Sequence, residues 1–298
     1  MTEVLRGIFP ALQATFDNNG DLDIPSMEQQ VTHSIEAGTH GLVYPVMGGE
    51  LFYLSESERK RLIEVVVGTA SNQVPVVAGV AAPATPIAVE YAKYAKEVGA
   101  DAVIALPPYI TRGGTQEELR AYYRAIAEAA ELPVFIQHSW PGMSAEFMAS
   151  LIQEIENVKY IKEETRPSGH SISAALAATG PECLGVFGGA GGQWIIPEMR
   201  RGASGFIPHA HVTDVLVQVW DAFHAGDEAK ARDIFSHLYP MLSVMAVAGG
   251  NRVAKEVLVR RGVISTVTVR TPQTPELDDT DRHELDIAMK ELEPLFQL

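Results

Sequence analysis

One unit of sequence recurs through the first 211 residues: a short apolar run, a turn rich in Gly or Pro, and a stretch with apolar residues three and four positions apart. The apolar runs predict strands at residues 7–16, 41–47, 74–80, 101–108, 132–139, 158–164, 184–189 and 205–210. The stretches between them predict helices, for example at residues 26–38, 55–70, 86–100 and 116–130. Eight such units, with strands apolar on both faces, predict an α/β fold of the TIM (β/α)8 barrel class. A doubly wound open sheet is the alternative, although such a sheet rarely needs eight regular units.

The pattern changes after residue 211, where helical patterns continue without further strands. They predict helices within residues 212–226, 227–249, 251–262 and 281–296, and residues 271–281 are expected to form an exposed connection. We therefore predict two parts, a (β/α)8 barrel over residues 1–211 and a C-terminal helical block over residues 212–298 that packs on the barrel.

The composition predicts a soluble globular protein with a sizeable core, since 46% of the 298 residues are hydrophobic and 20% are charged. The 38 acidic residues exceed the 23 basic ones, and the net charge of -15 disfavours nucleic acid and anionic membranes as partners. The N-terminal residues show no long apolar run after a basic start, and no apolar run reaches about 18 residues, so neither secretion nor membrane spanning is expected. A single cysteine, Cys183, excludes an internal disulfide and a Cys-based zinc site. We expect it to be a reduced, buried thiol of a cytoplasmic protein.

A lysine interrupts the sixth predicted strand near its C-terminal end, where barrels of this class carry their chemistry. Because strand side chains alternate, Tyr160, Lys162 and Glu164 share one face, whereas Ile161 and Glu163 share the other. An apolar interior disfavours a charged lysine, which is the condition that a Schiff-base nucleophile needs. An ionised Glu164 has the opposite effect, and the sequence leaves open which effect prevails. The alternative is an ion pair between Lys162 and a glutamate that serves only packing or solubility.

Several short motifs resemble those of the dihydrodipicolinate synthase and N-acetylneuraminate lyase family of Schiff-base barrels. They are N-G-x-L (Asn19, Gly20, Leu22), Gly49-Glu50 after the second strand, VPVVAGV on the third, LPPY (106–109) on the fourth, LPVFIQ on the fifth and IKE (161–163) on the sixth. The resemblance covers nearly the whole chain and implies that Lys162 condenses with the ketone of pyruvate or another 2-oxo acid. It also implies a homotetramer built as a dimer of dimers. No cofactor and no metal are expected.

The fifth strand departs from the family pattern. Most members carry a catalytic tyrosine there, as a Tyr-Asn pair followed by proline, whereas this chain has Gln137-His138. The synthase has an arginine shortly after the proline for its aldehyde substrate, but here Pro141 is followed by Gly142 and Met143. The usual proton shuttle is absent, and a role in lysine biosynthesis is disfavoured.

The sixth strand shows a closer resemblance, to the branch of L-2-keto-3-deoxyarabonate dehydratase. That branch also replaces the tyrosine by glutamine and carries Lys-x-Glu-Thr, as in Lys162-Glu163-Glu164-Thr165 here. We predict that Glu164 removes a proton from C3 of the imine and protonates the leaving hydroxyl at C4, with a pKa raised toward neutrality by burial. The predicted activity is that of a hydro-lyase acting on a 2-keto-3-deoxy sugar acid. Alternatives are a class I aldolase that releases pyruvate, a dihydrodipicolinate synthase-like enzyme and a catalytically idle ligand-binding barrel.

Lys162, Glu164 and Gln137 are thus the predicted catalytic residues. The predicted substrate-binding residues are Gly48, Gly49, Glu50, Tyr109, Gly188 and Ile207. Met47 and Gly48 replace the family's hydroxyl pair, but the N–H groups of Gly48 and Gly49 are still able to receive a carboxylate. Glu50 is expected to support the site or to cap the following turn.

The sequence indicates a functional role less strongly for several other residues. Tyr109 matches a family tyrosine that reaches a neighbouring subunit's site, with interface packing as the alternative. His138 is expected on the face opposite Gln137, in a structural role. His209 and His211, together with Glu50, raise a metal alternative that no zinc-type spacing supports. The glycines of residues 188–194 are expected to leave room for substrate above Lys162, and Arg112 is a candidate for attracting an anionic substrate.

Overall fold

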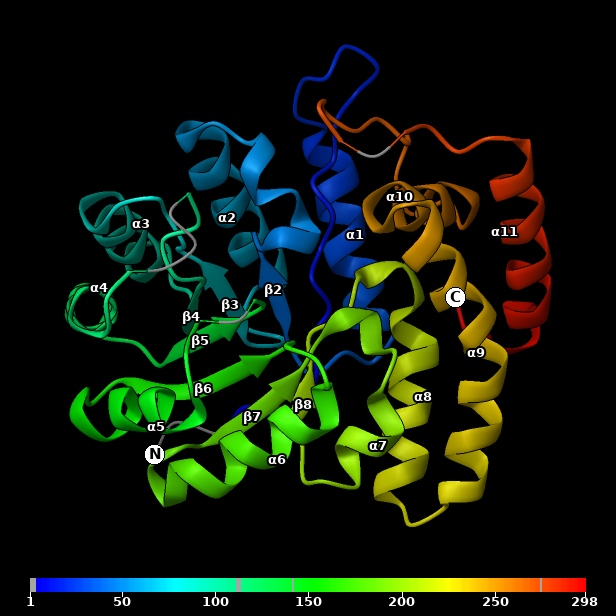
Figure 1. Cartoon of the computed structure of the whole chain (residues 1–298). Coiled ribbons are helices and arrows are strands. Elements are labelled where there is room, and N and C mark those ends of the chain that lie inside the picture. The colour runs from blue at the N-terminus through cyan, green and yellow to red at the C-terminus, as the bar shows by residue number, and fades with distance from the viewer. Residues whose placement is uncertain (1–3, 111–113, 141, 274) are drawn as a thin grey trace. The chain divides into compact units, whose positions relative to one another are not determined.

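The computed structural model describes residues 4–110, 114–140, 142–273 and 275–298 (Figure 1). Strands and helices alternate along the chain as predicted, and the fold is a TIM (β/α)8 barrel with a C-terminal helical extension. The chain forms two compact units, one of residues before Ile8 together with Pro75–Ile207, the other of Ile8–Val74 together with Pro208–Leu298. The predicted division at residue 211 stays a prediction. Among the described residues, no helix has the length and apolar character that crossing a membrane requires.

The first unit holds six parallel strands that pair with one another in chain order. These strands are β3 (Val76–Gly79), β4 (Ala102–Ala105), β5 (Val134–His138), β6 (Val158–Glu163), β7 (Gly185–Gly188) and β8 (Gly205–Phe206). Its helices are α3 (Thr85–Glu97), α4 (Gln116–Ala130), α5 (Ala145–Glu154), α6 (Ser168–Thr179) and α7 (Ile195–Met199). In Figure 1, α5 and α6 lie on one side of β6 and β7. Strands covered in this way are apolar on both faces, which is why the sequence shows continuous apolar runs.

The register of β5, β6 and β7 sets the positions of the polar side chains at their ends. Gln137 of β5 pairs with Lys162 of β6, which in turn pairs with Phe187 of β7. Two residues before Gln137 and Lys162, the rings of Phe135 and Tyr160 stack with centroids 4.3 Å apart. The Phe187 ring contacts both of them edge to face. Two packed aromatic rings, Phe135 and Tyr160, thus precede Lys162 on its own face, and Phe187 lies beside it on the next strand.

The second unit contains most of the remaining elements. They are β1 (Gly7–Ile8, of which Ile8 belongs here), β2 (Leu42–Tyr44), α1 (Ile24–Glu36), α2 (Glu56–Ala70), α8 (Thr213–His224), α9 (Glu228–Ala248), α10 (Gly250–Arg260) and α11 (Asp279–Leu292). The helix ends follow their sequence signals: α2 begins with a capping box of Ser55 and Glu58, in which each side chain bonds the other's backbone N–H. Parallel bridges join Ala11 to Val43 and to His209.

The predicted element bounds differ from the observed ones mainly at strand ends. The expected strand 7–16 shortens to Gly7–Ile8, and 205–210 shortens to Gly205–Phe206. Pro10 and Pro208 follow these strands, and proline has no N–H for a strand hydrogen bond. The helix predicted at 116–130 has these same bounds. Residues 271–281 are mostly exposed where described, apart from the buried Leu277.

Cys183 is half-buried rather than fully buried, and it immediately precedes the segment that leads into β7. Its thiol contacts the Gly185 carbonyl oxygen at 3.5 Å. Burial raises the pKa of this thiol above its ordinary value, so it is protonated at neutral pH.

Candidate active site

Lys162 lies near the C-terminal end of β6 with only 4% of the residue exposed. Its Nζ atom is 3.2 Å from Oε2 of Glu164, the next residue on the same face. A buried lysine is stabilised in its charged form only by a close anion, and Glu164 supplies it. The two residues therefore form an ion pair at the C-terminal end of β6.

The Glu164 carboxylate accepts hydrogen bonds from two other segments of the first unit. The Ser139 hydroxyl donates to Oε2 at 2.5 Å, and Gln137 Nε2 donates to the same oxygen at 3.3 Å. The backbone N–H of Ala190, in the turn after β7, donates to Oε1 at 3.0 Å. Lys162 adds its charge. Glu164 is thus the centre of the cluster, and it brings together the three predicted catalytic residues.

The protonation state of Glu164 differs from the expected one. Burial acts to raise its pKa, but the Lys162 charge and the bonds from Ser139 and Ala190 outweigh burial, and the pKa lies below the ordinary value. The expectation of a raised pKa is wrong for the free enzyme, because a cation and several donors face this carboxyl. Glu164 is therefore a carboxylate at neutral pH, which is the form of a general base.

Two adjacent glycines leave space for different carboxyl groups. A Cβ at Gly189 would lie 2.2 Å from Glu164 Oε1, so only glycine allows Glu164 its place beside Lys162. A Cβ at Gly188 would instead lie 2.0 Å from Oε2 of Glu198. The sequence predicted that these glycines leave room for substrate above Lys162; the space beside Gly189 is instead filled by the Glu164 carboxyl, and the space beside Gly188 by Glu198.

The other face of β5 and β6 carries a second polar cluster. His138 Nδ1 lies 2.8 Å from Glu163 Oε2. The other Glu163 oxygen accepts the backbone N–H of Thr165 at 2.7 Å and its hydroxyl at 2.5 Å. His138 thus lies on the face opposite Gln137, as predicted, and its bond to Glu163 joins the ends of β5 and β6.

Glu198 of α7 was not predicted as a site residue. It is 1% exposed, and within the described part of the chain neither carboxyl oxygen has a hydrogen-bond partner. Burial, together with the charges of Glu164 and Glu163, raises its pKa to about 8, so it holds a proton at neutral pH. The acidic residue inside the apolar run IIPEM was the signal in the sequence.

The second unit contains the predicted residues Gly48, Gly49 and Glu50. Glu50 follows the short turn Met47–Gly49 in the left-handed backbone region, with φ of 59°. Its carboxylate pairs with Lys255 Nζ at 2.6 Å and accepts from Gln273 Nε2 at 2.7 Å. The expectation that Glu50 caps the following turn is wrong, because Lys255 and Gln273 occupy both of its oxygens.

Lys255 was missed by sequence reasoning, because its partner lies in a distant segment. It is fully buried, it donates to the Thr268 carbonyl oxygen at 2.6 Å, and its Nζ lies 4.6 Å from the centre of the Phe16 ring. Burial lowers its pKa below the ordinary value, and the charge of Glu50 acts in the opposite direction.

The histidines of the metal alternative also lie in the second unit. His209 Nε2 would be 3.1 Å from a Cβ at Gly48, so the ring lies against that glycine. Burial, with a further contribution from His209, lowers the pKa of His211 well below its ordinary value, so His211 is uncharged. Across the described residues, no group of three or more His, Cys, Asp or Glu side chains is arranged to hold a metal ion.

The remaining predicted residues have different surroundings. Tyr109 is half-buried in the segment after β4. Ile207 is buried, and its N–H donates to the Gly188 carbonyl oxygen at 3.0 Å. Arg112 and Pro141 lie outside the described residues.

Comparison with known proteins places the chain in a family. A sequence profile described as the dihydrodipicolinate synthetase family matches residues 4–292. The chain is 28% identical to an L-2-keto-3-deoxyarabonate dehydratase of Azospirillum brasilense, over 97% of this chain and 95% of the relative. It is 31% identical to a 4-hydroxy-tetrahydrodipicolinate synthase of Desulfotalea psychrophila, with 97% of both chains covered. Among solved structures, a dihydrodipicolinate synthase of Acinetobacter baumannii in complex with pyruvate is 28% identical, with a TM-score of 0.88 over 98% of this chain and 100% of the other.

Proposed function

Since the chain belongs to the dihydrodipicolinate synthetase family and is a class I lyase acting on a small molecule, we propose that it dehydrates a 2-keto-3-deoxy sugar acid such as L-2-keto-3-deoxyarabonate. The reaction passes through an imine on Lys162. The observation that carries the proposal is the Glu164 carboxylate, which contacts Lys162 at 3.2 Å in a chain that has Gln137 in place of the family tyrosine.

Imine formation begins with a proton transfer within the ion pair. Lys162 passes a proton to Glu164, and the neutral amine adds to the C2 ketone of the substrate. Glu164 returns this proton to the carbinolamine hydroxyl, which leaves as water. The products of this stage are a protonated imine on Lys162 and a carboxylate at Glu164, so the net charge of the pair is unchanged.

Dehydration uses the same carboxylate twice. Glu164 first removes a proton from C3, and the protonated imine becomes a neutral enamine. Because the cation that lowered the pKa of Glu164 has been neutralised, its pKa rises and the carboxylic acid becomes a proton donor. It then protonates the C4 hydroxyl, which leaves as water while the enamine electrons restore the protonated imine. Hydrolysis of this unsaturated imine frees Lys162.

The hydrogen-bond partners of Glu164 hold its carboxylate in position. Ser139 and Gln137 hold Oε2, and the Ala190 N–H holds Oε1, which limits the carboxylate to small movements between Lys162 and the substrate carbons. Gln137 has no ionisable proton, so it is suited to orient Glu164 and the substrate rather than to shuttle protons.

The proposed substrate contacts are those predicted from the sequence. The backbone N–H of Gly48 suits the carboxylate of a 2-oxo acid, whereas the predicted N–H of Gly49 already donates to the Val46 carbonyl oxygen at 2.8 Å. Glu50 acts through its ion pair with Lys255, which fixes the glycine turn. The other proposed substrate-binding residues are Tyr109, Gly188 and Ile207. We extend the proposal to a cytoplasmic homotetramer. Sedimentation of the purified chain tests the tetramer.

A substrate panel tests the reaction. The purified chain is incubated with 2-oxo-3-deoxy pentonates and hexonates, and products are identified by mass spectrometry. Dehydrated product without pyruvate is the expected result. Pyruvate as the main product would identify an aldolase. Condensation of pyruvate with aspartate semialdehyde would identify a synthase.

Borohydride trapping with pyruvate tests the imine separately. A covalent adduct is expected on the wild-type chain and on Lys159→Ala, because Lys159 is a second lysine of β6 that is not part of the cluster. No adduct is expected on Lys162→Ala. An adduct that persists in Lys162→Ala, or is absent from the wild type, would remove the imine from the mechanism.

A further inference from the structure

Glu163 is a buried acid between Lys162 and Glu164 on β6, and the proposed mechanism gives it no role. It is 1% exposed, and its side chain lies on the opposite face of the strand. One carboxyl oxygen accepts the Thr165 N–H at 2.7 Å and the Thr165 hydroxyl at 2.5 Å, and the other lies 2.8 Å from His138 Nδ1. Groups of the protein itself therefore engage both oxygens. We refer to His138, Glu163 and Thr165 as the Glu163 cluster.

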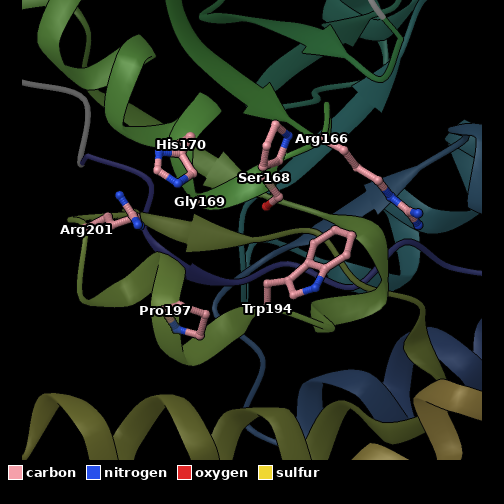
Figure 2. A pocket seen from close by; sticks show the side chains of 8 residues that line it. Arg166, Ser168, Gly169, His170, Trp194, Pro197 and Arg201 are labelled. Carbon is pink, nitrogen blue, oxygen red and sulfur yellow. The ribbon is translucent and has the colours of Figure 1, made fainter.

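The cavities near this part of the chain do not make the Glu163 cluster a ligand site. A cavity of about 550 Å³, shown in Figure 2, is lined by residues of the segments 166–170 and 194–201, which include no member of the cluster. His138 borders a second cavity of about 60 Å³, far below the roughly 300–1,000 Å³ of ligand pockets. The cluster therefore acts on the protein around it rather than on a bound molecule.

Three links join the end of β5 to the end of β6. On one face, the Glu163 carboxyl meets the His138 ring. Within the sheet, the Glu164 N–H donates to the His138 carbonyl oxygen at 2.9 Å. On the other face, the Ser139 hydroxyl donates to Glu164 Oε2 at 2.5 Å. Because His138 and Ser139 are consecutive, as are Glu163 and Glu164, the link on the first face limits the distance that the Ser139 bond spans.

The bonds to Thr165 hold the backbone on the other side of Glu164. The Glu163 side chain reaches past Glu164 to the N–H of the next residue, which fixes the turn directly after the strand. The peptide groups before and after Glu164 are thus both held. The position of its carboxylate depends on these peptide groups as well as on its own side-chain torsions.

Stability alone does not account for a polar cluster at this place. A buried carboxylate loses its hydration, and apolar side chains of similar volume commonly give equal or greater stability than a buried ion pair. Directed hydrogen bonds supply fixed distances and angles instead. The arrangement around Glu163 is therefore suited to setting atomic positions.

We infer that Glu163 is a positioning residue for the dehydration, which together with His138 and Thr165 holds the backbone around Glu164 so that its carboxylate stays beside Lys162 and within reach of the substrate. The inference rests on the proposed function, because it acts through Glu164 as acid and base. A displacement of about 1 Å in a catalytic group can lower the rate by about 10²-fold, so a looser Glu164 is expected to affect kcat.

The combined substitution His138→Leu with Glu163→Met tests the inference. This apolar variant removes the directed bonds but keeps the space filled, so it is expected to fold. Its kcat, measured with the 2-oxo-3-deoxy acid that wild type dehydrates fastest, is expected to fall by about 10- to 10²-fold, with KM within about twofold of wild type.

Glu163→Gln is the conservative variant. Its amide oxygen can accept the Thr165 N–H, and its NH₂ group can donate to an unprotonated His138 Nδ1, so both links survive. We expect it to retain most of the wild-type kcat. A loss as large as in the apolar variant would mean that the charge of Glu163 matters and not the positions it sets, which would overturn the inference.

The titration of Glu164 gives a measurement that does not depend on turnover. Infrared difference spectra between wild type and Glu164→Gln identify its carboxyl band, whose midpoint is followed with pH. The Lys162 charge and the Ser139 bond lower the pKa of Glu164, so a looser carboxyl is expected to titrate at higher pH in the apolar variant. The nearby titratable groups Lys162 and Glu198 are unchanged in that variant.

Tyr123→Phe is the control for loss of a buried hydrogen bond elsewhere in the first unit. It removes the 3.1 Å bond from the Tyr123 hydroxyl to the Ala105 carbonyl oxygen and should leave the Glu164 midpoint and kcat unchanged. Thermal unfolding confirms that each variant is folded; should the apolar variant not fold, His138→Leu alone is measured in its place.

The outcomes separate this inference from the proposed function. An unmoved Glu164 midpoint in the folded apolar variant overturns the inference, whether or not kcat falls. If wild type dehydrates no sugar acid, the proposed function fails. A midpoint displaced to higher pH would then still show that Glu163 positions Glu164.

Discussion

Two buried lysines of this chain each face a glutamate, and their surroundings differ. The Lys162 and Glu164 side chains are 5% and 14% exposed, with 3.2 Å between Nζ and Oε2. The Lys255 and Glu50 side chains are both 0% exposed, with 2.6 Å between the charged atoms. Lys255 has a carbonyl partner and an aromatic ring as well, whereas within the described residues Glu164 is the one anion or acceptor that contacts Lys162.

Under the proposed function, this difference distinguishes a reactive pair, Lys162 with Glu164, from a structural one, Lys255 with Glu50. An amine that attacks a ketone needs a free direction of approach and a nearby group to take its proton. Lys162 has both, since its carboxylate partner is held by other donors and the pair is partly open. Lys255 has its directions filled, and its enclosed pair fixes the backbone of residues 47–50. Residue type and burial are alike in the two lysines, so our proposal that Lys162 is the catalytic one depends on its smaller number of partners.

Glu164→Gln gives the largest expected effect on the reactive pair. The amide keeps the hydrogen-bonding shape but does not accept the C3 proton, so kcat is expected to fall by about 10²–10⁴-fold. Borohydride trapping with pyruvate is expected to persist at a lower rate, because the amide does not take the Lys162 proton during imine formation. The exposed Glu182→Gln is the charge-matched control and should retain wild-type kcat. Unchanged turnover in Glu164→Gln would exclude Glu164 as the acid and base.

Lys255→Met probes the enclosed pair. It leaves Glu50 charged and buried without its cation, and the free energy of unfolding is expected to fall by about 3–5 kcal/mol. Urea denaturation measures this loss, with the exposed Lys230→Met as the control that should change it by less than about 0.5 kcal/mol.

The double variant Lys255→Met with Glu50→Gln sharpens the same comparison. Because the uncompensated charge is removed, it is expected to recover part of the stability lost in Lys255→Met. An additive loss in the double variant would show that the two side chains are not energetically coupled.

The sequence predicted the reactive pair better than the enclosed one, and strand geometry explains why. Lys162 and Glu164 are two positions apart on one strand, so period-two alternation places them on one face. Gln137 could be predicted to lie near this pair because parallel strands end at a common edge. Glu50 and Lys255 come from segments that no local period connects, and their contact depends on tertiary packing.

The sequence also did not predict the direction of the Glu164 pKa shift or the ends of two strands. The direction of the Glu164 pKa shift depends on hydrogen bonds from Ser139 and Ala190, which the sequence does not place beside it. Two strands end early at prolines, because an apolar run does not reveal where hydrogen bonding stops.

Glu198 adds a third case, a buried carboxyl without a cation. Its pKa of about 8 in the folded state lies above the 4.5 of an unperturbed glutamic acid, so the folded chain binds the proton more tightly than the unfolded chain does. Stability is therefore expected to fall as pH rises from 4.5 through 8. Glu198→Gln removes this titration and should be more stable than wild type at pH 8 by on the order of 2–4 kcal/mol, with a much smaller difference near pH 4.5. Urea denaturation at both pH values measures it; a constant difference between the two would contradict the assignment.

Ser139→Ala gives the smallest expected effect and separates position from chemistry in the reactive pair. The variant removes the 2.5 Å hydrogen bond to Glu164 Oε2 but leaves Lys162, Gln137 and the Ala190 N–H in place. A hydrogen bond to a charged group contributes about 1.5–3 kcal/mol, part of which the remaining donors replace, so kcat is expected to fall about tenfold. Since the Ser139 bond lowers the pKa of Glu164, the acidic limb of the kcat–pH profile should move to higher pH. Ser139→Thr, which keeps the hydroxyl, should restore both. A fall in kcat without displacement of the acidic limb would mean that Ser139 only packs against the cluster.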